Sequence, residues 1–589
     1  MFDLRSVARG FLCCAIIALF LFNPCELYLF AQEDIIELNL NASSATVITP
    51  KIFRPNIDLS GRGHNNVAYW PQELASPESI ETWKKAIGFS GMYRIQYNLW
   101  EISESKERDK LLNSYEEVIK NINDAGGIVI LDIFGTPAGM GRILDKRSAV
   151  RDYRAFKELI KSHINRLSVE KKYNIWYEVW SAPDLDDFFL GGKQDYLNLY
   201  RAVAEAVKEL RAKSKIYISL GGPSVSWWFQ NFDGANIIKP ERSLIYELIK
   251  YCSRYNLPLD FISWHAYSTD PKTDQEMTVY NKNASSLIRD WLSYFRLDRN
   301  IPIIIDEWNY DSGPNVIPER RQNCQIAASF IPARIKYMHL AGINYQQLFS
   351  LEDFYDTEEN VIRNIGIFWF DQRASGYKGG PKSLFSVYKM LLKLGDYIFT
   401  DSLKADNEFV GMIASKSSNE LAIIVYSYID PVISKNYVSR NISSLSDADR
   451  KSLLGLFSSG DFDKLISREI DITKLRVRNK LKNLLKKAQE LKEQANSFAS
   501  KDHTLRLNIK NINGDYVYQR YVVDAVCISD CDFAPAEEKD VSSKDNLTLE
   551  FNFKPYSVNL LVLKNKPQEV KSEAAKLPQD TKVKQENAQ

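Results

Sequence analysis

The strongest constraint on the fold is an alternation of apolar strand patterns and amphipathic helix patterns between residues 53 and 394. Eight short runs rich in Ile, Val, Phe, Trp and Tyr predict strands, over 53–59, 91–99, 127–134, 174–180, 215–220, 261–267, 302–308 and 343–349. Helical spacing of apolar residues predicts helices over 106–125, 151–167, 194–213, 242–255, 283–295, 322–340 and 383–394. Eight strands, most of them followed by a helix, indicate an α/β protein with a (β/α)8 barrel over residues 51–395.

An open, doubly wound parallel sheet is the alternative architecture for such an alternation. Sheets of that kind usually carry a glycine-rich phosphate loop directly after the first strand. No such loop follows residues 53–59. The barrel is therefore the favoured fold.

The pattern changes after Gly395, where short strand runs separated by turns predict an accessory β-sandwich over residues 396–565. An N-terminal strand within residues 32–50 is expected to join it. A polar helical insertion is expected at about 444–500, packed on the sandwich by its apolar face. We interpret its lysine-rich face as solvent-facing, with a partner-binding helix as the alternative. The charged residues 566–589 predict a disordered tail.

The first 31 residues read as an export signal. Arg5 and Arg9 precede an apolar run over 11–22, Asn23-Pro24 interrupts it, and Ala31 offers a small residue at a cleavage site. The run is short for a membrane span. We therefore expect a secreted or periplasmic protein with no membrane contact after cleavage, and an uncleaved anchor is the alternative. The remaining cysteines are Cys252, Cys324, Cys527 and Cys531, and a bridge between the last two is left open.

Composition excludes several functional classes. The 76 Lys and Arg residues balance 75 Asp and Glu residues, so no net field attracts nucleic acid. The five histidines stand at positions 64, 163, 265, 339 and 503, and none has metal-ligand spacing to cysteines or carboxylates. No metal and no cofactor is expected, and the sequence leaves the oligomeric state open. The aromatic content of 12% suits stacking on sugar rings, although most aromatic residues fill the core.

The chemistry is expected at the ends of two strands. The run 174–180 contains one acid, Glu178, and ends at Ser181-Ala182-Pro183, whereas the run 302–308 ends with Glu307. Barrel enzymes keep their active sites at the C-terminal ends of the strands. Cleavage of a glycosidic bond uses two carboxyl groups there: one attacks the sugar or activates water, and the other protonates the departing oxygen. Glu307 supplies one of these groups.

Three further side chains are expected beside Glu307. His265 and Tyr267 end the preceding strand, and a tyrosine hydroxyl can orient a carboxylate and keep it ionised. Arg94, in the second strand, can do the same by its charge. Each also has a structural interpretation, as an ion pair or a core residue.

Several stretches, in order along the chain, resemble glycoside hydrolase family 39, whose activities include β-xylosidase and α-L-iduronidase. They are LNSYEEVIKNINDAGGIVILDIFGTP ending at Pro137, YEVWSAPDLDDFF at 177–189, LNLYRAVAEAVK at 197–208, SLGGPS at 219–224, DFISWHAYS at 260–268 and IDEWN at 305–309. The resemblance covers roughly residues 50–395. It implies that Glu307 is the catalytic nucleophile. It places substrate-binding groups at Arg94, Trp180, Ser181, His265, Tyr267, Trp308 and Asn309.

The chain departs from the family at the acid/base. The family's strand-four motif reads E-V-W-N-E-P, whereas this chain has Ser181-Ala182 in place of Asn-Glu. Loss of general acid catalysis costs typically about 10²- to 10⁴-fold in rate. Three explanations are open. In the first, the acid has been displaced to the following loop, where the candidates are Asp184, Asp186 and Asp187. In the second, the site binds sugar without cleaving it, and in the third, the substrate needs no acid. Glu178 is expected to lie too deep in the barrel to replace it.

The sequence therefore predicts an exported hydrolase of the O-glycosidic bonds of a poly- or oligosaccharide. Glu307 is the predicted nucleophile, with Asp184 or Asp186 as the displaced acid/base or with none. The alternative is a catalytically inactive carbohydrate-binding protein.

Overall fold

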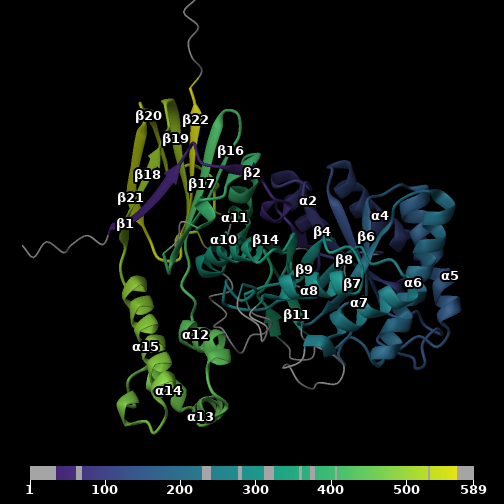
Figure 1. Ribbon diagram of the computed structural model, residues 1–589. Coiled ribbons are helices and arrows are strands. Elements are labelled where there is room, and N and C mark those ends of the chain that lie inside the picture. The colour runs from purple at the N-terminus through teal and green to yellow at the C-terminus, as the bar shows by residue number, and fades with distance from the viewer. Residues whose placement is uncertain are drawn as a thin grey trace, which may run out of the picture.

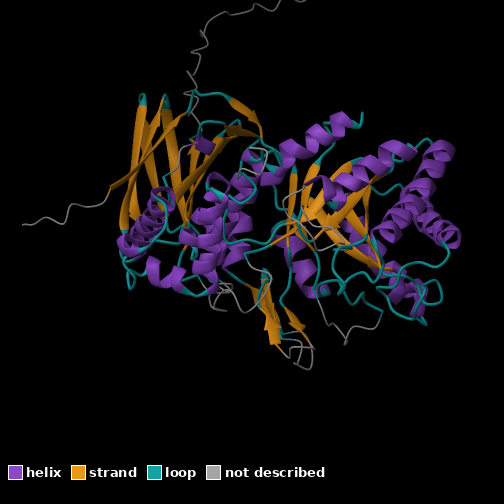
Figure 2. Ribbon diagram, turned by 60° about the horizontal axis from the view of Figure 1, so that its bottom comes forward, coloured by secondary structure: helices purple, strands orange, loops and turns teal. Residues whose placement is uncertain are grey.

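The computed structural model describes residues 35–61, 69–228, 240–275, 282–310, 324–356, 361–371, 378–404, 407–527 and 531–566. The predicted export signal, the tail after residue 566 and His64 lie outside these ranges. The described chain forms a barrel at one end of the molecule and a β-sandwich at the other, with helices between them (Figure 1, Figure 2).

The predicted barrel is confirmed. Within the described residues, eight parallel strands close in the order β10-β3-β4-β5-β6-β7-β8-β9. Their bounds are β3 Ile57–Asp58, β4 Met92–Asn98, β5 Ile128–Phe134, β6 Ile175–Val179, β7 Ser219–Val225, β8 Phe261–His265, β9 Ile303–Trp308 and β10 Tyr345–Leu348. Because all eight strands run in the same direction, their C-terminal residues gather at one end of the barrel.

Strand β7 differs from the prediction, because it extends to Val225 instead of ending at 220. The Gly-Gly-Pro-Ser run reads as a turn in the sequence. In the barrel, Gly221 packs directly on β8: a Cβ there would lie 2.5 Å from both the ring and the carbonyl oxygen of Phe261. The glycine therefore allows close packing of two strands.

Helices surround the barrel. In chain order they are α2 Pro77–Ala86, α3 Leu99–Glu104, α4 Arg108–Asp124, α5 Tyr153–Ile164, α6 Lys193–Ser214, α7 Leu244–Tyr255, α8 Ala284–Tyr294, α10 Gln325–Leu340 and α11 Ser383–Leu392. Helix α2, between β3 and β4, was not predicted from the sequence. Helix α5 shows how the sequence specifies them: Asp152 caps its N-terminus, and Phe156, Ile160 and Ile164 form its buried stripe. Helix α10 is buried on nearly all sides because it lies between the barrel and the sandwich.

The strands after the barrel form two sheets. In the described residues the larger sheet has the order β2-β15-β16-β17-β22-β19-β20, and the smaller has β1-β18-β21. Their bounds are β1 Ile35–Asn41, β2 Thr46–Ile48, β15 Tyr397–Phe399, β16 Val410–Lys416, β17 Glu420–Ser427, β18 His503–Lys510, β19 Gly514–Val523, β20 Glu537–Ser543, β21 Asn546–Phe553 and β22 Val558–Asn565. The inward residues of both sheets share one apolar core. The single N-terminal strand expected within residues 32–50 is two strands, one in each sheet.

The helical insertion begins earlier than predicted and forms its own core. It comprises α12 Ile433–Asn441, α13 Asp447–Ser458, α14 Asp461–Ile466 and α15 Asn479–Ala499. Apolar residues from these helices, including Leu453, Phe462 and Leu485, pack on one another instead of on the sheets. Figure 1 shows the insertion extending away from the sandwich. The insertion was expected to pack on the sandwich. In the structure only the end of the insertion nearest the sandwich does so.

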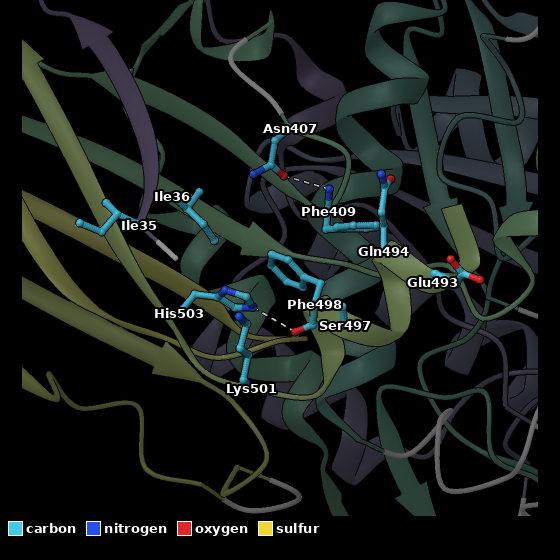
Figure 3. Close-up of a pocket in the computed structure, with 10 residues that line it drawn as sticks. All are labelled: Ile35, Ile36, Asn407, Phe409, Glu493, Gln494, Ser497, Phe498, Lys501 and His503. Atoms are coloured by element: carbon cyan, nitrogen blue, oxygen red, sulfur yellow. Dashed lines mark hydrogen bonds between the residues drawn. The ribbon is translucent and has the colours of Figure 1, made fainter. Parts of the chain in front are cut away.

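The base of the insertion joins the sandwich through aromatic packing. The Phe498 ring lies 4.0 Å from the His503 ring and 5.1 Å from the Phe409 ring, measured between centroids. These side chains line an open groove beside Ile35, the first described residue (Figure 3). The groove is lined by residues of the sandwich and α15, so it is separate from the ends of the barrel strands.

Two further features concern the compartment. Cys527 and Cys531 form a disulfide, which does not involve Cys252 or Cys324. In the part of the chain that the structure describes, no helix is long and apolar enough to cross a bilayer.

Since the insertion has a separate core, damage to that core is expected to stay local. Leu485 is completely buried, and Leu485→Ala should cost about 2–5 kcal/mol of local stability. Hydrogen exchange should accelerate in α12–α15, with the exchange of barrel amides unchanged. Leu454→Ala is the matched control, because that leucine is 58% exposed. Equal acceleration in barrel and insertion would show a shared core.

Candidate active site

A buried arginine occupies the centre of the barrel near the C-terminal ends of the strands. Arg94, in β4, contacts carboxylates from four other strands. The distances are 2.8 Å from Nε to Glu178 Oε2, 2.9 Å from Nη1 to Asp58 Oδ2, 3.2 Å from Nη2 to Asp132 Oδ2 and 3.5 Å from Nη1 to Glu307 Oε2. One cation thus joins β3, β5, β6 and β9 to β4.

Strand register places these acids around the arginine. Arg94 is opposite Asp58 across β3 and β4, and Asp132 is opposite Glu178 across β5 and β6. Asp306 adds a fifth carboxyl group, directly before Glu307. The cluster therefore contains more acidic groups than one guanidinium can neutralise.

Protonation resolves part of this imbalance. Burial raises the pKa of Asp132 to about 8 and raises that of Asp306 well above its usual range. Glu178 adds to the shift of Asp306 by its charge and by a hydrogen bond with the protonated carboxyl. Burial opposes the charge of Arg94, but the surrounding carboxylates raise its pKa well above the usual value. At neutral pH the arginine is charged, while Asp132 and Asp306 hold protons.

Glu307 differs from the other four acids because it reaches solvent. Its side chain is 15% exposed, whereas those of Asp58, Asp132 and Glu178 are fully buried. Tyr267 Oη donates a hydrogen bond of 2.6 Å to Glu307 Oε1. The tyrosine and the guanidinium both favour the carboxylate form and fix its orientation. A fixed, solvent-accessible carboxylate at a strand end is the arrangement that a nucleophile needs.

His265 lies between Glu307 and the end of β7. Its Nε2 is 3.6 Å from Glu307 Oε2 and 3.0 Å from Ser224 Oγ. Burial, followed by the charge of Arg94, lowers the pKa of His265 to about 3. The imidazole is therefore neutral at physiological pH. It forms a hydrogen bond with Ser224 and adds no positive charge to the site.

The end of β6 has a constrained backbone. Trp180 and Ala182 have φ angles of 71° and 43°, and Ser224, at the end of β7, has 53°. Residues other than glycine adopt this region at a cost, and such residues concentrate at functional sites. The Ala182 amide donates a 2.8 Å hydrogen bond to the Ser224 carbonyl, which joins the two strand ends. Ala182 itself is 1% exposed.

The three aspartates after Ala182 have different surroundings. Asp184 is half-buried, and its Oδ1 accepts a 2.9 Å hydrogen bond from the Ser226 amide while Oδ2 accepts one from the Ser226 hydroxyl. These bonds join Asp184 to the chain two residues after Ser224, the serine that faces His265. Asp186 and Asp187 are exposed.

Some residues expected to bind substrate have structural partners instead. The indole N–H of Trp180 donates to the Phe188 carbonyl at 3.1 Å, and that of Trp308 donates to Gln346 Oε1 at 2.6 Å. Asn309 donates to the carbonyls of Phe349 and Ile365. Both tryptophans are fully buried, and Ser181 and Asn309 are nearly so. Both indoles, predicted to bind substrate, lie in the protein interior with their N–H groups paired.

The loop after β8, which carries Tyr267, is held by the other domain. Tyr428 Oη donates to the Thr269 carbonyl at 2.5 Å, and Thr269 Oγ1 donates to Asp430 at 2.9 Å. Arg440, in α12, donates to Asp270 Oδ2 at 2.6 Å. These contacts are buried or nearly so. The sandwich and the insertion therefore fix a loop of the candidate site.

Sequence reasoning missed Asp58, Asp132, Ser224 and Asp306 as members of the cluster. Asp132 is the single charged residue inside the apolar run 128–134, which is a readable signal for a buried acid with a charged partner. Asp58 and Asp306 gave a weaker signal, because another charged residue stands in each of their predicted strands. Ser224 gave no such signal. Among the residues that the structure describes, no group of three or more His, Cys, Asp or Glu side chains has a metal-binding arrangement.

Comparison with known proteins identifies the relatives of this chain. The family described as glycosyl hydrolases family 39 matches residues 135–460, more than half of the chain. A β-xylosidase of Geobacillus stearothermophilus is 23% identical over 295 residues, 47% of this chain and 53% of that protein. A β-xylosidase of Caldicellulosiruptor saccharolyticus is 25% identical over 181 residues, 30% of this chain and 33% of that protein. The chain thus spans about half the length of the first of these curated relatives and a third of the second.

Solved structures share the fold. A GH39 enzyme of Xanthomonas axonopodis pv. citri aligns with a TM-score of 0.59 at 14% identity, covering 90% of this chain and 98% of that one. A monomeric β-xylosidase of Caulobacter crescentus CB15 aligns with a TM-score of 0.58 at 13% identity, covering 90% and 99%. These similarities confirm the barrel architecture.

The raised pKa of Asp132 predicts a pH dependence of stability. Its folded-state pKa of about 8 exceeds the usual value of 3.8, so its stabilising effect is complete below about pH 4 and is lost as the pH rises towards 8. One such group changes the unfolding free energy by at most about 1.4 kcal/mol per pH unit. We expect the unfolding free energy, measured by urea denaturation between pH 5 and 8, to fall less steeply with pH in Asp132→Asn than in the wild type. The exposed Asp187→Asn is the control, and equal slopes in all three proteins would refute the assignment.

The contact between Arg440 and Asp270 predicts that the insertion rigidifies the loop after β8. Breaking a buried ion pair typically costs about 3–5 kcal/mol, because one charge stays buried alone. Arg440→Met should therefore accelerate hydrogen exchange at residues 266–274 by at least about tenfold. Lys435→Met removes an exposed ion pair with Asp463 from the same helix and should leave that loop unchanged. Unchanged exchange in Arg440→Met would show that the contact does not constrain the loop.

Proposed function

The chain belongs to glycosyl hydrolases family 39, and we propose that it hydrolyses O-glycosidic bonds of a poly- or oligosaccharide by a retaining mechanism with Glu307 as the nucleophile. The observation that carries this proposal is the 2.6 Å hydrogen bond from Tyr267 to a carboxylate that also faces Arg94 and solvent. In a retaining mechanism that carboxylate attacks the anomeric carbon and forms a glycosyl-enzyme, which water then hydrolyses.

Asp184 is the best-placed candidate for the second carboxyl group. It is hydrogen-bonded to Ser226, two residues after the serine that faces His265, whereas Asp186 and Asp187 are exposed further along the loop. Both of its oxygens accept hydrogen bonds from Ser226, so transfer of a proton to a leaving group requires that these bonds rearrange. In this proposal the first step depends little on Asp184 when the leaving group is good, whereas activation of water in the second step depends on it.

A carbohydrate-binding protein without hydrolytic activity is the second candidate. It is favoured by Ala182, a methyl group at the position where the family has its acid/base, and by the engagement of Asp184 with Ser226. The barrel site would then hold a sugar without cleaving the bond.

We propose that the protein works outside the cytoplasm, after removal of residues 1–31. The Cys527–Cys531 disulfide supports this location, because such bonds persist in oxidising compartments. Aryl β-xylosides are the first substrates to test, because the relatives named above are β-xylosidases.

Pre-steady-state release of an aryl group distinguishes the possibilities. Aryl glycosides with good leaving groups need no acid in the first step, so a working nucleophile should release one aryl group per protein in a burst. Slow turnover after the burst indicates that no base activates water, whereas sustained turnover indicates a second carboxyl group. Intact mass spectrometry should find the glycosyl group on the peptide that contains Glu307, and Glu307→Gln should abolish both burst and label.

Two variants then locate the second group. Asp184→Asn should slow sustained turnover by about 10²- to 10⁴-fold if Asp184 activates water, with the exposed Asp187→Asn as the matched control. Ala182→Glu should accelerate the hydrolysis of substrates with poor leaving groups if the protein lacks an acid at the position of the family's acid/base. Absence of a burst and of a label on every aryl glycoside, with sugar binding retained, would refute hydrolysis and leave the binding protein.

A further inference from the structure

The helical insertion has a charge that the rest of the chain lacks. Residues 433–499 carry 14 Lys and Arg residues against 8 Asp and Glu residues, out of 76 and 75 in the whole chain. The remaining residues are therefore slightly acidic. The basic excess is concentrated in one part of a nearly neutral protein.

Within the insertion the cations gather in one run. Residues 474–487 contain seven cations and no acid, and these are Lys474, Arg476, Arg478, Lys480, Lys482, Lys486 and Lys487. All of them are exposed except Lys482, which is half-buried. We refer to residues 474–487 as the cationic run.

The contacts of these cations within the insertion are mostly with uncharged groups, apart from an exposed ion pair of 3.5 Å between Lys487 and Glu490. Arg478, Lys480 and Lys482 donate hydrogen bonds to uncharged oxygens, those of Ser446, Ser444 and Thr473. Lys482 also lies one helical turn from both Arg478 and Lys486, and like charges at that spacing destabilise a helix. The stability of the insertion comes from its apolar core, which includes Leu481, Leu484 and Leu485. A ligand of opposite charge would offset the repulsion among the cations.

The position of the insertion relates this charge to the candidate active site. Its first helix is fixed to the loop that carries Tyr267 by the contact of Arg440 with Asp270. Figure 1 shows α13–α15 extending on the same side of the molecule as β11 (Phe354–Asp356), which follows the last barrel strand. The cationic run therefore lies on an arm rooted beside the opening of the barrel.

The composition of the cationic run argues against two kinds of polyanion. It contains no aromatic residue on which the bases of a single-stranded nucleic acid could stack. The apolar face of α15 is buried within the insertion, so it is not available to enter a lipid bilayer. A flexible polymer that carries carboxylate or sulfate groups, and needs only charge contacts, fits the surface better.

We propose that the cationic run binds an acidic polysaccharide and holds it beside the barrel. The choice of a glycan rests on the proposed function, whereas the binding itself does not depend on hydrolysis. The sugar acid groups contact the lysines and arginines of the arm, and a neighbouring part of the same chain reaches the barrel.

Binding is best measured on Glu307→Ala, so that hydrolysis plays no part. The probes are polygalacturonate as the acidic glycan, xylan as the neutral one, and single-stranded DNA as a polyanion that is not a glycan. Titration calorimetry at several salt concentrations should show binding of polygalacturonate that weakens as salt rises, with no comparable binding of xylan.

The decisive variant is Arg476→Ser/Lys486→Ser/Lys487→Ser, which should weaken polygalacturonate binding at least about tenfold. Its control is Lys435→Ser/Lys451→Ser/Lys464→Ser, with the same change of charge on exposed cations of the same insertion, and it should change binding less than about twofold. Equal weakening in both variants, or no binding by Glu307→Ala, would overturn the proposal. DNA binding as tight as that of polygalacturonate would also overturn it, in favour of a nucleic-acid partner. The aryl-release burst of the wild type tests Glu307 separately, so the two proposals can fail independently.

Discussion

The candidate site depends on one buried cation. The Arg94 guanidinium, in β4, contacts carboxylates from four other strands, so five of the eight barrel strands are positioned relative to a single group. Its planar arrangement of donors suits this role, because it contacts several carboxylates in fixed directions. Without it the acids would be buried close together with no compensating charge, which is strongly unfavourable. The same cation that stabilises the barrel interior also orients Glu307.

The acids of the cluster differ in their burial. Two deeply buried ones hold protons, whereas Glu307 reaches solvent. Asp132 and Asp306 are buried and remain protonated near neutral pH. Glu307, one residue after Asp306, has a tyrosine donor and access to solvent. Neutral His265 completes the surroundings without a second positive charge. The end of β6 has a constrained backbone at Trp180 and Ala182 and is joined to the end of β7 by the hydrogen bond from Ala182 to Ser224.

Sequence patterns predicted the barrel because strand and helix periods are local properties of the chain. They also placed Glu307, His265 and Tyr267 at strand ends, where the structure brings them together. Arg94 was predicted beside Glu307, but its contacts with Asp58, Asp132 and Glu178 were missed because they depend on register between strands, such as Asp132 opposite Glu178. The burial of Trp180 was missed for a related reason: β6 ends in left-handed backbone, which breaks the alternation of side chains along the strand.

The accessory domain is part of the site because of the loop after β8. Thr269 and Asp270 lie two and three residues beyond Tyr267, and both bind residues that follow the barrel in sequence. A loop fixed at both ends has fewer conformations than a free one, so the tyrosine reaches Glu307 with less loss of entropy. The insertion that supplies Arg440 also carries the cationic run. One element, the insertion, therefore both anchors the loop that follows Tyr267 and carries the cationic run.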